Sequence, residues 1–414
     1  MIELKDLSQG FRNPELMQSL SQRIHQLSGQ LSEPIKIMEV CGGHTHTIMK
    51  YGLNQLLPRN IEFIHGPGCP VCIMPKERID HAIELAMLPE VILVTLGDMI
   101  RVPGSKGTLA QCRAKGGDVR PIYDPLDALE IAKQNPDRKV VFFAIGFETT
   151  TPMTAVLLEL AEKQNVANLY FHINHVLVPP AVDAVMADGA AKVTAFIGPS
   201  HVSAITGSDI YQPIVDCYHT PVVVSGFEPV DVMQSILMIV EQKVQGIAKL
   251  EVQYTRVVTA KGNQAAQQKV ASMFTLRPHF RWRGLGDIPL SSLVLSEQYR
   301  HRDAEIVFAD ALSDQAIEDH KACQCADILR GLAKPNQCRV FGRGCTPTKP
   351  MGSCMVSSEG ACNAYYRYAG LAFDLDLNKD AAAKEVTTDE AVTGKATTNE
   401  ASINRAKTEK EITA

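Results

Sequence analysis

Short apolar runs that alternate with helical patterns constrain the fold of this chain most. Seven such runs, each bounded by Gly or Pro, are IKIMEV, IEFIHG, VILVTLG, VVFFAIG, LYFHIN, VTAFIG and PVVVSG. Between them lie amphipathic stretches such as PKERIDHAIELAML and TPMTAVLLELAEKQ. Nearly continuous apolar strands separated by helices are typical of parallel sheets that helices cover on both faces. The pattern therefore predicts an α/β fold.

An internal echo indicates how the sheets are divided. AIGFETTTP begins at residue 144 and VSGFEPVD at residue 224. In both motifs an apolar run leads into Gly-Phe-Glu and a helical pattern. A chain of 414 residues is also too long for one ordinary domain. We therefore predict two similar parallel-sheet α/β domains and a third, Cys-rich region.

The expected boundaries follow the motifs. The first α/β domain covers 31–140 with the CGGHTH and GPGCPVC loops, and the second covers 141–255 with the GFETT and GPSH loops. The Cys-rich region covers 256–375, with a helix from 1–30 packing on it. Residues 376–414 are rich in Ala, Thr, Glu and Lys and lack aromatic residues, which predicts a disordered tail.

Charge and hydropathy exclude several classes of protein. The net charge is −5 and no dense basic cluster occurs, so we expect no nucleic-acid partner. No apolar run approaches the roughly 20 residues of a membrane span, and the N-terminus has no secretory signal pattern. We therefore expect a cytoplasmic protein without a membrane partner. In that reducing compartment, the 11 cysteines are metal ligands or redox thiols rather than structural disulfides.

Two Gly-rich loops carry cysteines directly after predicted strands, at the edge where parallel sheets bind ligands. Cys41 precedes a predicted helix whose N-terminus would favour a thiolate. Cys69 and Cys72 form a C-x2-C motif, which is either a redox dithiol, a pair of metal ligands or a tight turn whose cysteines merely pack. His44 and His46 are two residues apart and would point to different sides of a helix. At most one of them is expected beside a metal.

Other polar residues at these strand ends have two interpretations each. Glu148 and Glu228 follow Gly-Phe and either cap the next helix or accept protons. His201 of the GPSH loop lies at the same edge, where it either packs or takes part in the site. Glu359, near the end of the Cys-rich region, either bonds a loop backbone or shuttles a proton. Isolated Cys112 and Cys217 are expected to be semi-buried small side chains.

Six cysteines crowd into residues 323–362 with the spacing C-x-C-x12-C-x6-C-x8-C-x7-C. Zinc sites usually contain paired C-x2-C knuckles, which this region lacks. Widely spaced thiolates suit a [4Fe–4S] cluster, whose irons each take one thiolate. We therefore predict an iron–sulfur region, with zinc and inert or disulfide-forming cysteines as the alternatives. Because a cluster needs only four thiolates, two thiols remain for a dithiol beside it.

The division of these six cysteines rests on local geometry. In an extended stretch, Cys323 and Cys325 would point in opposite directions, so only one would reach the cluster. The residues around Cys354 suggest a flexible loop. The predicted cluster ligands are Cys323, Cys338, Cys345 and Cys362, with Cys325 and Cys354 as a redox pair or alternative ligands. An exchange of roles between Cys323 and Cys325 stays open.

Several long motifs together resemble one family. They are MEVCGGHTHT, HGPGCPVC, GDMIRVPGS, AIGFETTTP, FIGPSHVSAITG and the cysteine block that ends in CMVSSEGAC. Over most of 35–370 the chain is similar to the HypD family of hydrogenase maturation factors. The resemblance implies a role in building the Fe(CN)2(CO) group of nickel–iron hydrogenases. It also implies a [4Fe–4S] cluster in the C-terminal region and cysteine pairs that relay electrons.

The resemblance further implies partners and a metal site. Family members hold a mononuclear iron, which comes to carry cyanide and CO, together with HypC, and the cyanide arrives from HypE and HypF. Such iron is soft and suits thiolate ligands, so Cys41 is the first candidate, with Cys69 and Cys72 completing the site or supplying electrons. His44 and Glu359 are further catalytic candidates. No G-x4-GK[ST] motif occurs, so no ATP site is predicted.

These features favour a cofactor-assembly factor with redox activity over an independent enzyme. The alternative function is a cluster-dependent protein disulfide reductase, which would need no mononuclear iron. A zinc-stabilised interaction module is a third hypothesis, and it would show no redox activity.

Overall fold

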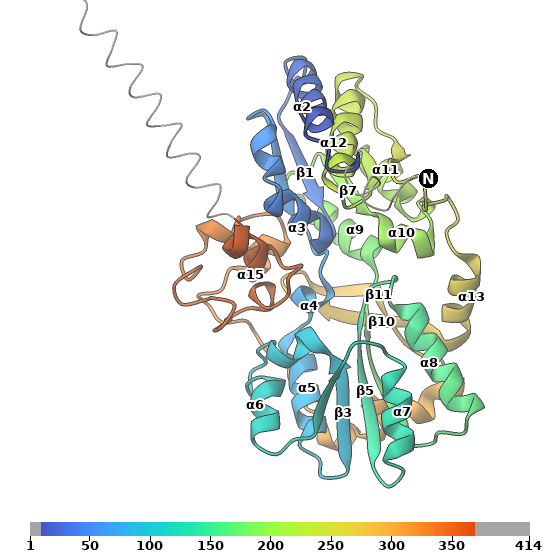
Figure 1. Ribbon diagram of the computed structural model, residues 1–414. Coiled ribbons are helices and arrows are strands. Elements are labelled where there is room, and N and C mark those ends of the chain that lie inside the picture. Colours follow the sequence, from blue (N-terminus) through green and yellow to red (C-terminus); the bar gives the residue numbers. More distant parts are fainter. Residues whose placement is uncertain (1–9, 369–414) are drawn as a thin grey trace, which may run out of the picture. The chain divides into compact units, whose positions relative to one another are not determined.

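The computed structural model describes residues 10–368 and contains two parallel sheets (Figure 1). Sheet A has the strand order β2-β1-β7-β8-β9 and sheet B the order β4-β3-β5-β6. The strands of sheet A are β1 (Ile35–Glu39), β2 (Ile61–His65), β7 (Ala195–Pro199), β8 (Val222–Ser225) and β9 (Leu250–Val252). Those of sheet B are β3 (Val91–Leu96), β4 (Val119–Ile122), β5 (Lys139–Gly146) and β6 (Leu169–His175). The predicted α/β fold with two parallel sheets is confirmed, whereas the tail expected at 376–414 lies outside the described residues.

The two sheets repeat one topology but share the chain in a way the sequence did not predict. Numbered within each sheet, both begin with the strand order 2-1-3-4. After β2 the chain builds all of sheet B and then returns to sheet A at β7. Each sheet therefore takes strands from both sides of the boundary expected at residue 140. The apolar runs identify strands, but they carry no information about which strand pairs with which.

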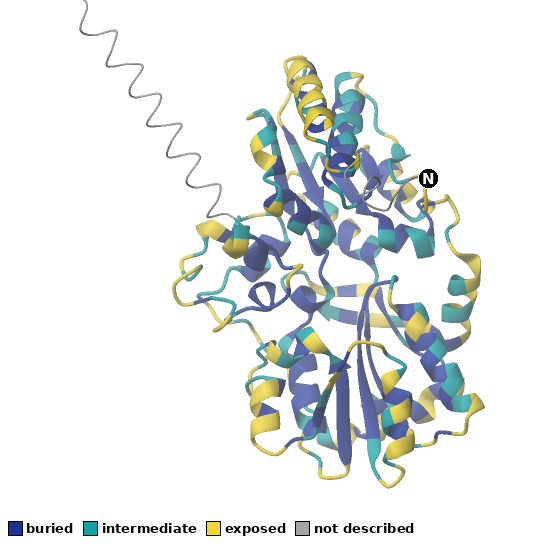
Figure 2. Ribbon diagram, viewed as in Figure 1, coloured by how far each residue is buried: buried dark blue, intermediate teal, exposed yellow. Residues whose placement is uncertain are grey.

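The strands of both sheets are mostly buried (Figure 2). Successive side chains along a strand point to opposite faces of the sheet, and here each face packs into a different core. In sheet A, Ile37 lies in a core with α2 (Pro14–Ser28) and α12 (Pro229–Val244), while Met38 lies in the core that contains α9 (Val178–Asp188). In sheet B, Leu93 faces α5 (Lys76–Ala86) and Val94 shares a core with α7 (Asp127–Gln134) and α8 (Thr151–Lys163).

The N-terminal helix packs elsewhere than the sequence predicted. We expected it on the Cys-rich region, but α2 lies along α12 of sheet A (Figure 1). Its apolar face, formed by Met17, Leu20, Ile24 and Leu27, is buried in the same core as Ile236 of α12. An amphipathic pattern predicts such a buried face without naming the surface that covers it.

A β-hairpin connects the sheets to the Cys-rich region. Strands β10 (Phe274–Trp282) and β11 (Gly286–Leu295) pair antiparallel and lie between the two sheets in Figure 1. The backbone N–H of Leu177, ahead of α9, donates to Ser291 O at 2.9 Å. The sequence did not predict this hairpin, because Gly and Arg interrupt its apolar pattern.

The remaining elements are short. The other α-helices are α3 (Gly42–Lys50), α4 (Pro70–Ile73), α6 (Leu109–Ala114), α10 (Ser200–Thr206), α11 (Gln212–Tyr218), α13 (Gln264–Met273), α14 (Ala304–Val307) and α15 (Cys325–Leu329). Single 3-10 turns are η1 (Leu53–Leu56), η2 (Gly97–Arg101), η3 (Asp209–Tyr211), η4 (Glu297–Arg302), η5 (Ala309–Ala311), η6 (Pro335–Gln337) and η7 (Ser353–Met355). Within 10–368, none of the helices has the length and hydropathy to span a membrane.

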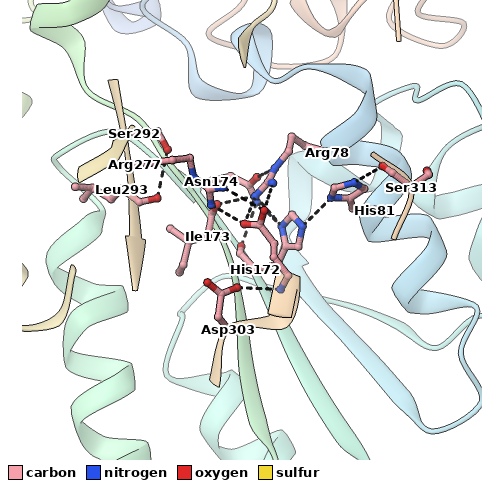
Figure 3. A network of polar contacts seen from close by, with 11 residues as sticks. Arg78, His81, His172, Ile173, Asn174, Arg277, Ser292, Leu293, Asp303 and Ser313 are labelled. Carbon is pink, nitrogen blue, oxygen red and sulfur yellow. Dashed lines mark hydrogen bonds and ion pairs between the residues drawn. The ribbon is translucent and has the colours of Figure 1, made fainter. Parts of the chain in front are cut away.

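A buried polar network ties sheet B to the hairpin and to α14 (Figure 3). The guanidinium of Arg78 donates to Asn174 Oδ1 at 2.6 Å and to Glu305 Oε1 at 2.8 Å, and Arg277 Nη2 donates to the same carboxylate at 2.6 Å. His172 lies beside them, with its Nε2 3.2 Å from His81 Nδ1. Burial alone would raise the pKa of Glu305, but Arg78, His172 and Arg277 hold it well below its usual value.

We expect Glu305→Gln to be among the most destabilising single changes in the fold. It leaves two guanidinium groups facing a neutral amide in a buried site, which costs about 3–5 kcal/mol. Urea unfolding at pH 7 measures the loss, and a cost below about 1 kcal/mol would contradict this account. Since the folded-state pKa of Glu305 lies below 4.5, its contribution is present above that pH and fades as the pH falls. The difference between variant and parent should therefore narrow at low pH.

Glu297→Gln is the matched control for this experiment. Glu297 pairs with Arg300 at 3.3 Å, but both side chains are exposed. Exposed ion pairs contribute little, so this change should alter the free energy of unfolding by no more than about 0.5 kcal/mol.

Candidate metal and thiol site

The two sheets direct their ligand-binding edges toward one cavity. In sheets of this strand order, ligands bind where the order reverses, beyond the carboxyl ends of the first and third strands. In sheet A these strands are β1, which leads to Cys41, and β7, which leads to His201. In sheet B they are β3 and β5, which lead to Asp98 and Thr149. His201, Asp98 and Thr149 all line one cavity of about 730 Å³, together with Glu359.

Cys41, the residue before α3, does not itself line this cavity but lies behind its wall, against His201. The side chain is 2% exposed and its Sγ is 3.6 Å from His201 Nε2. Burial raises the pKa of this thiol well above its usual value, and the charge of Glu359 raises it further. The backbone N–H groups of Gly43 and His44 oppose this but do not outweigh burial. The helix N-terminus therefore favours the thiolate, as expected, but burial outweighs its effect on the pKa of Cys41.

The histidines around Cys41 are neutral and stacked. The ring of Phe227 stacks against His44 and His201, with centroids 4.5 Å and 4.9 Å away. Burial lowers the pKa of both histidines to about 4. His44 Nε2 is 3.2 Å from Ser225 O and 3.1 Å from Gly226 O, so this nitrogen carries the proton. His44 thus anchors α3 to the end of β8.

His46 lies apart from His44, as the spacing predicted. It is partly exposed and meets the ring of Tyr368 edge-on at a centroid distance of 5.2 Å. Among the described residues, His46 has no recorded contact with Cys41. His201, from a distant part of the sequence, takes the place next to the thiol instead.

The C-x2-C loop packs directly against the Cys41 loop. Cys69 and Cys72 are joined by a disulfide across the first turn of α4. Gly68 allows the close approach, because a Cβ there would lie 2.1 Å from the carbonyl carbon of Val40. Gly42 N donates to Gly68 O at 3.1 Å. The oxidised pair therefore belongs to the same local structure as Cys41.

Glu359 of the Cys-rich region packs against the loop that follows Cys41. A Cβ on Gly42 would lie 2.3 Å from the backbone oxygen of Glu359, so only glycine fits beneath this loop. The backbone N–H of Glu359 donates to Ser357 Oγ at 3.3 Å. Glu359 lines the cavity, and burial, followed by the charge of Asp98, raises the pKa of its carboxyl group.

All six C-terminal cysteines surround one small internal cavity of about 10 Å³. Cys325 Sγ and Cys354 Sγ are 2.7 Å apart, and these two residues are only 2% and 1% exposed. The local geometry differs from our expectation in two respects. Cys325 begins α15 rather than lying in an extended stretch, and Cys354 lies in the buried turn η7 rather than in a flexible loop.

The residues of this cavity suit a [4Fe–4S] cluster in their donor chemistry. They are the six thiols with Ile328, Val340, Phe341, Gly352 and Met355, and include no carboxylate or imidazole. All-thiolate surroundings in an apolar shell are what such clusters use.

A short polar bridge links the two thiol pairs. Ser353, next to Cys354, donates from Oγ to Cys72 O at 2.9 Å. Arg283, from the turn of the hairpin, donates to Ser353 Oγ and its backbone N–H donates to Ile73 O at 2.8 Å. Asp319 accepts from Arg283 Nε at 2.8 Å. Arg283 was not singled out from the sequence, because RWRGLG contains no motif and the burial of Arg283 depends on distant segments.

The echoed Gly-Phe-Glu motifs differ in function. Glu228 takes part in a capping box at the start of α12 and pairs with Arg12 at 2.9 Å, so it is a helix cap. Glu148 does not cap the helix that follows it. Its Oε1 accepts from the backbone N–H of Val178 at 2.9 Å, at the start of α9.

The fold and the site together define a class: an α/β protein in which two sheets share one ligand-binding edge beside a buried cluster of thiols. Comparison with known proteins is more specific. The family model described as the hydrogenase formation hypA family, HypD, matches residues 15–369. The chain belongs to the HypD family of hydrogenase maturation factors.

Individual relatives agree closely with this assignment. The chain is 48% identical over 366 residues to hydrogenase maturation factor HypD of Rhodobacter capsulatus, which covers 87% of this chain and 97% of that protein. It is 47% identical to HypD of Escherichia coli strain K12, covering 86% and 96%, and 51% identical to HypD of Azotobacter vinelandii, covering 80% and 89%. A solved conserved domain protein from Vibrio cholerae aligns over 66% of this chain and 98% of its own, but at 11% identity and a TM-score of 0.14 it says nothing about the fold.

Proposed function

We propose that this chain is the scaffold and redox component that assembles the Fe(CN)2(CO) group of nickel–iron hydrogenases. In this proposal it holds an iron together with HypC in a reducing cytoplasm and accepts cyanide from HypE and HypF. Family membership supports a role in hydrogenase maturation. The observation that carries the finer proposal is the position of Cys41, a soft ligand whose Sγ is 3.6 Å from His201, a residue of the cavity that both sheets share.

The residues around Cys41 can support metal binding. A thiol must lose its proton to become an iron ligand, and His201 Nε2, at 3.6 Å, is the neutral base beside it. Burial disfavours the free thiolate, so a bound cation is needed to stabilise it. The cavity of about 730 Å³ leaves room for a segment of HypC that carries the second sulfur ligand.

The second part of the proposal is an electron route to this site. A [4Fe–4S] cluster held by the six-thiol region would pass on single electrons from an external donor, and two of these with two protons would reduce a disulfide between Cys325 and Cys354 to the dithiol. The dithiol of Cys325 and Cys354 then reduces the disulfide of Cys69 and Cys72 by thiol–disulfide exchange. One disulfide forms as the other breaks, and two electrons and two protons pass to the C-x2-C loop. Ser353 and Arg283 support this route because they join the two pairs.

An infrared spectrum of the chain purified anaerobically with HypC tests the proposal. We expect bands in the cyanide and CO stretching regions, together with the brown colour of an iron–sulfur cluster. Bands that stay absent from a correctly folded, iron-loaded complex would refute the scaffold role. The same sample distinguishes the other hypotheses, because a zinc-stabilised module would contain zinc and no visible absorption.

A cluster-dependent protein disulfide reductase is the second candidate function. The contact between Cys325 and Cys354 and the nearby Cys69–Cys72 disulfide favour it. This function predicts turnover of a disulfide substrate by the chain alone, without cyanide or CO bands. Observing both turnover and the bands would mean that the redox route serves the assembly site.

A further inference from the structure

Successive side chains of the loop after β5 face two different cavities. Phe147, Thr149 and Thr150 line the large cavity next to Cys41. Glu148 lines a second cavity of about 290 Å³, which opens between α8, α10, α13 and the β-hairpin. The proposed assembly site therefore does not account for Glu148.

The second cavity is apolar apart from a few polar groups. Leu177, Ile205, Val270, Phe274, Leu276 and Leu293 form most of its wall. Leu276 is 49% exposed, so the cavity is open to solvent at the hairpin. Its volume is at the lower end for small-molecule sites, which typically combine apolar walls with a few fixed polar groups.

The carboxyl group of Glu148 is the unsatisfied polar group of this cavity. The residue is 8% exposed, and within residues 10–368 its Oε2 has no hydrogen-bond partner. Of the four other polar side chains in the wall, Thr275 is exposed to solvent and the remaining three are already bonded to backbone oxygens. Thr151 donates to Phe147 O at 3.0 Å, Thr206 to Val202 O at 3.0 Å and Gln267 to Ile205 O at 2.7 Å.

No cationic side chain of the described chain offsets the charge of Glu148. Burial raises its pKa to about 7, against the weaker effect of backbone N–H groups, including that of Val178. Lys269 of α13 pairs instead with Glu159 at 2.9 Å. The titratable neighbour is Tyr211, whose pKa is raised by burial and then by the charge of Glu148. The buried Glu148 Oε2 therefore lacks a hydrogen-bond donor, and a bound ligand could supply one.

We propose that this cavity binds a small organic cation, with a primary ammonium group donating to Glu148 Oε2 and an apolar body against the wall residues. An anion would meet the carboxylate with like charge. A neutral alcohol would satisfy the oxygen without compensating its charge. The ammonium group does both, and the apolar walls bury the rest of the ligand.

Calorimetric titration of the full chain with 2-phenylethylamine tests this site. We expect the amine to bind at pH 8, 2-phenylethanol to bind at least tenfold more weakly and 3-phenylpropanoate not to bind. Since Glu148 has a pKa of about 7, its ionised fraction falls about tenfold between pH 8 and pH 6, and the amine affinity should fall with it. Glu148→Gln keeps the acceptor for Val178 but removes the charge, so it should abolish both amine binding and this pH dependence.

Two phenylalanine variants on α13 show whether binding occurs in this cavity. Ala271 is an exposed residue in its wall, so Ala271→Phe should block the cavity and abolish binding. Ser272 is equally exposed but does not line the cavity, and Ser272→Phe should bind the amine like the parent. The proposal is overturned if the amine does not bind, if alcohol and amine bind equally, or if either Glu148→Gln or Ala271→Phe retains the parent affinity.

Discussion

Cys41→Ala is expected to abolish the cyanide and CO infrared bands of the complex with HypC while leaving the brown cluster intact. Cys41 is the thiol that the structure places next to His201 at the edge of the shared cavity. Alanine removes the proposed protein ligand on this side of the iron, and no neighbouring free cysteine in the described chain replaces it there. The six C-terminal thiols line a separate cavity and should keep their iron.

Cys112→Ala is the matched control. Cys112 is also a free, buried cysteine, 3% exposed, but its Sγ lies 3.9 Å from Ile83 O and it lines neither the shared cavity nor the six-thiol cavity. This variant should retain both the infrared bands and the brown colour. Unchanged bands in Cys41→Ala would remove this residue from the proposed role, whereas a loss of bands in both variants would point to a general defect in folding.

The strands were predictable from the sequence where they form continuous apolar runs. All seven apolar runs became strands, because continuous burial on both faces leaves a strong local pattern. β4 and β9 were missed: β4 contains Pro121 and polar Arg120, and β9 is three residues long. The hairpin was missed because its core-facing residues are interrupted by charged ones, as Phe280 and Trp282 are by the partly buried Arg281.

Strand pairing was not predictable for a different reason. The chain leaves sheet A after β2 and returns at β7, and nothing in the runs themselves records this excursion. The expected boundary at residue 140 therefore separated strands that pair, such as β3 and β5. Parallel pairs join residues far apart in sequence, so their partners are decided by packing over the whole domain.

The sequence predicted that the candidate site lies at the carboxyl edge of the sheets, but not how its side chains are arranged there. Parallel strands place their following loops on one side, which correctly grouped the loops of Gly68, Thr149 and His201 around one cavity. The sequence did not indicate that His201 adjoins Cys41 or that Arg283 lies between the thiol pairs. At Cys41 itself, the expected effect of the helix N-terminus is present, but full burial outweighs it and raises the pKa of the thiol.

The six C-terminal cysteines should divide into four whose loss removes the cluster and two whose loss does not. Cys325 and Cys354 are already in contact with each other and are the most deeply buried of the six. A hydrogen bond with Cys323 lowers the pKa of Cys325, a hydrogen bond with Cys325 lowers that of Cys354, and the charge of Arg283 lowers both. Burial and the remaining interactions with neighbouring thiols nevertheless raise both pKa values overall. A cationic neighbour stabilises a thiolate that attacks a disulfide, so this pair has the surroundings of a redox dithiol.

Alanine variants of each cysteine, purified anaerobically, test this division by their iron and sulfide content. Removing one of the four proposed ligands should lower iron from about four per chain to near zero. The variants in this group are those of Cys323, Cys338, Cys345 and Cys362. Cys325→Ala and Cys354→Ala should keep the cluster but expose one more alkylatable thiol after oxidation, since the remaining partner can no longer form a disulfide.

Cys217→Ala provides the control for the alkylation count. Cys217 is free and exposed, so its loss should remove one reactive thiol under all conditions and leave the iron content unchanged. Cys323 and Cys325 are the two residues whose roles as cluster ligand and redox thiol could be exchanged, because they are in contact. A hydrogen bond with Cys325 is the main cause of the raised pKa of the Cys323 thiol. If Cys325→Ala loses the cluster and Cys323→Ala keeps it, the two have opposite roles to those proposed. Loss of the cluster in Cys354→Ala would rule out the redox pair, because Cys354 would then be a ligand.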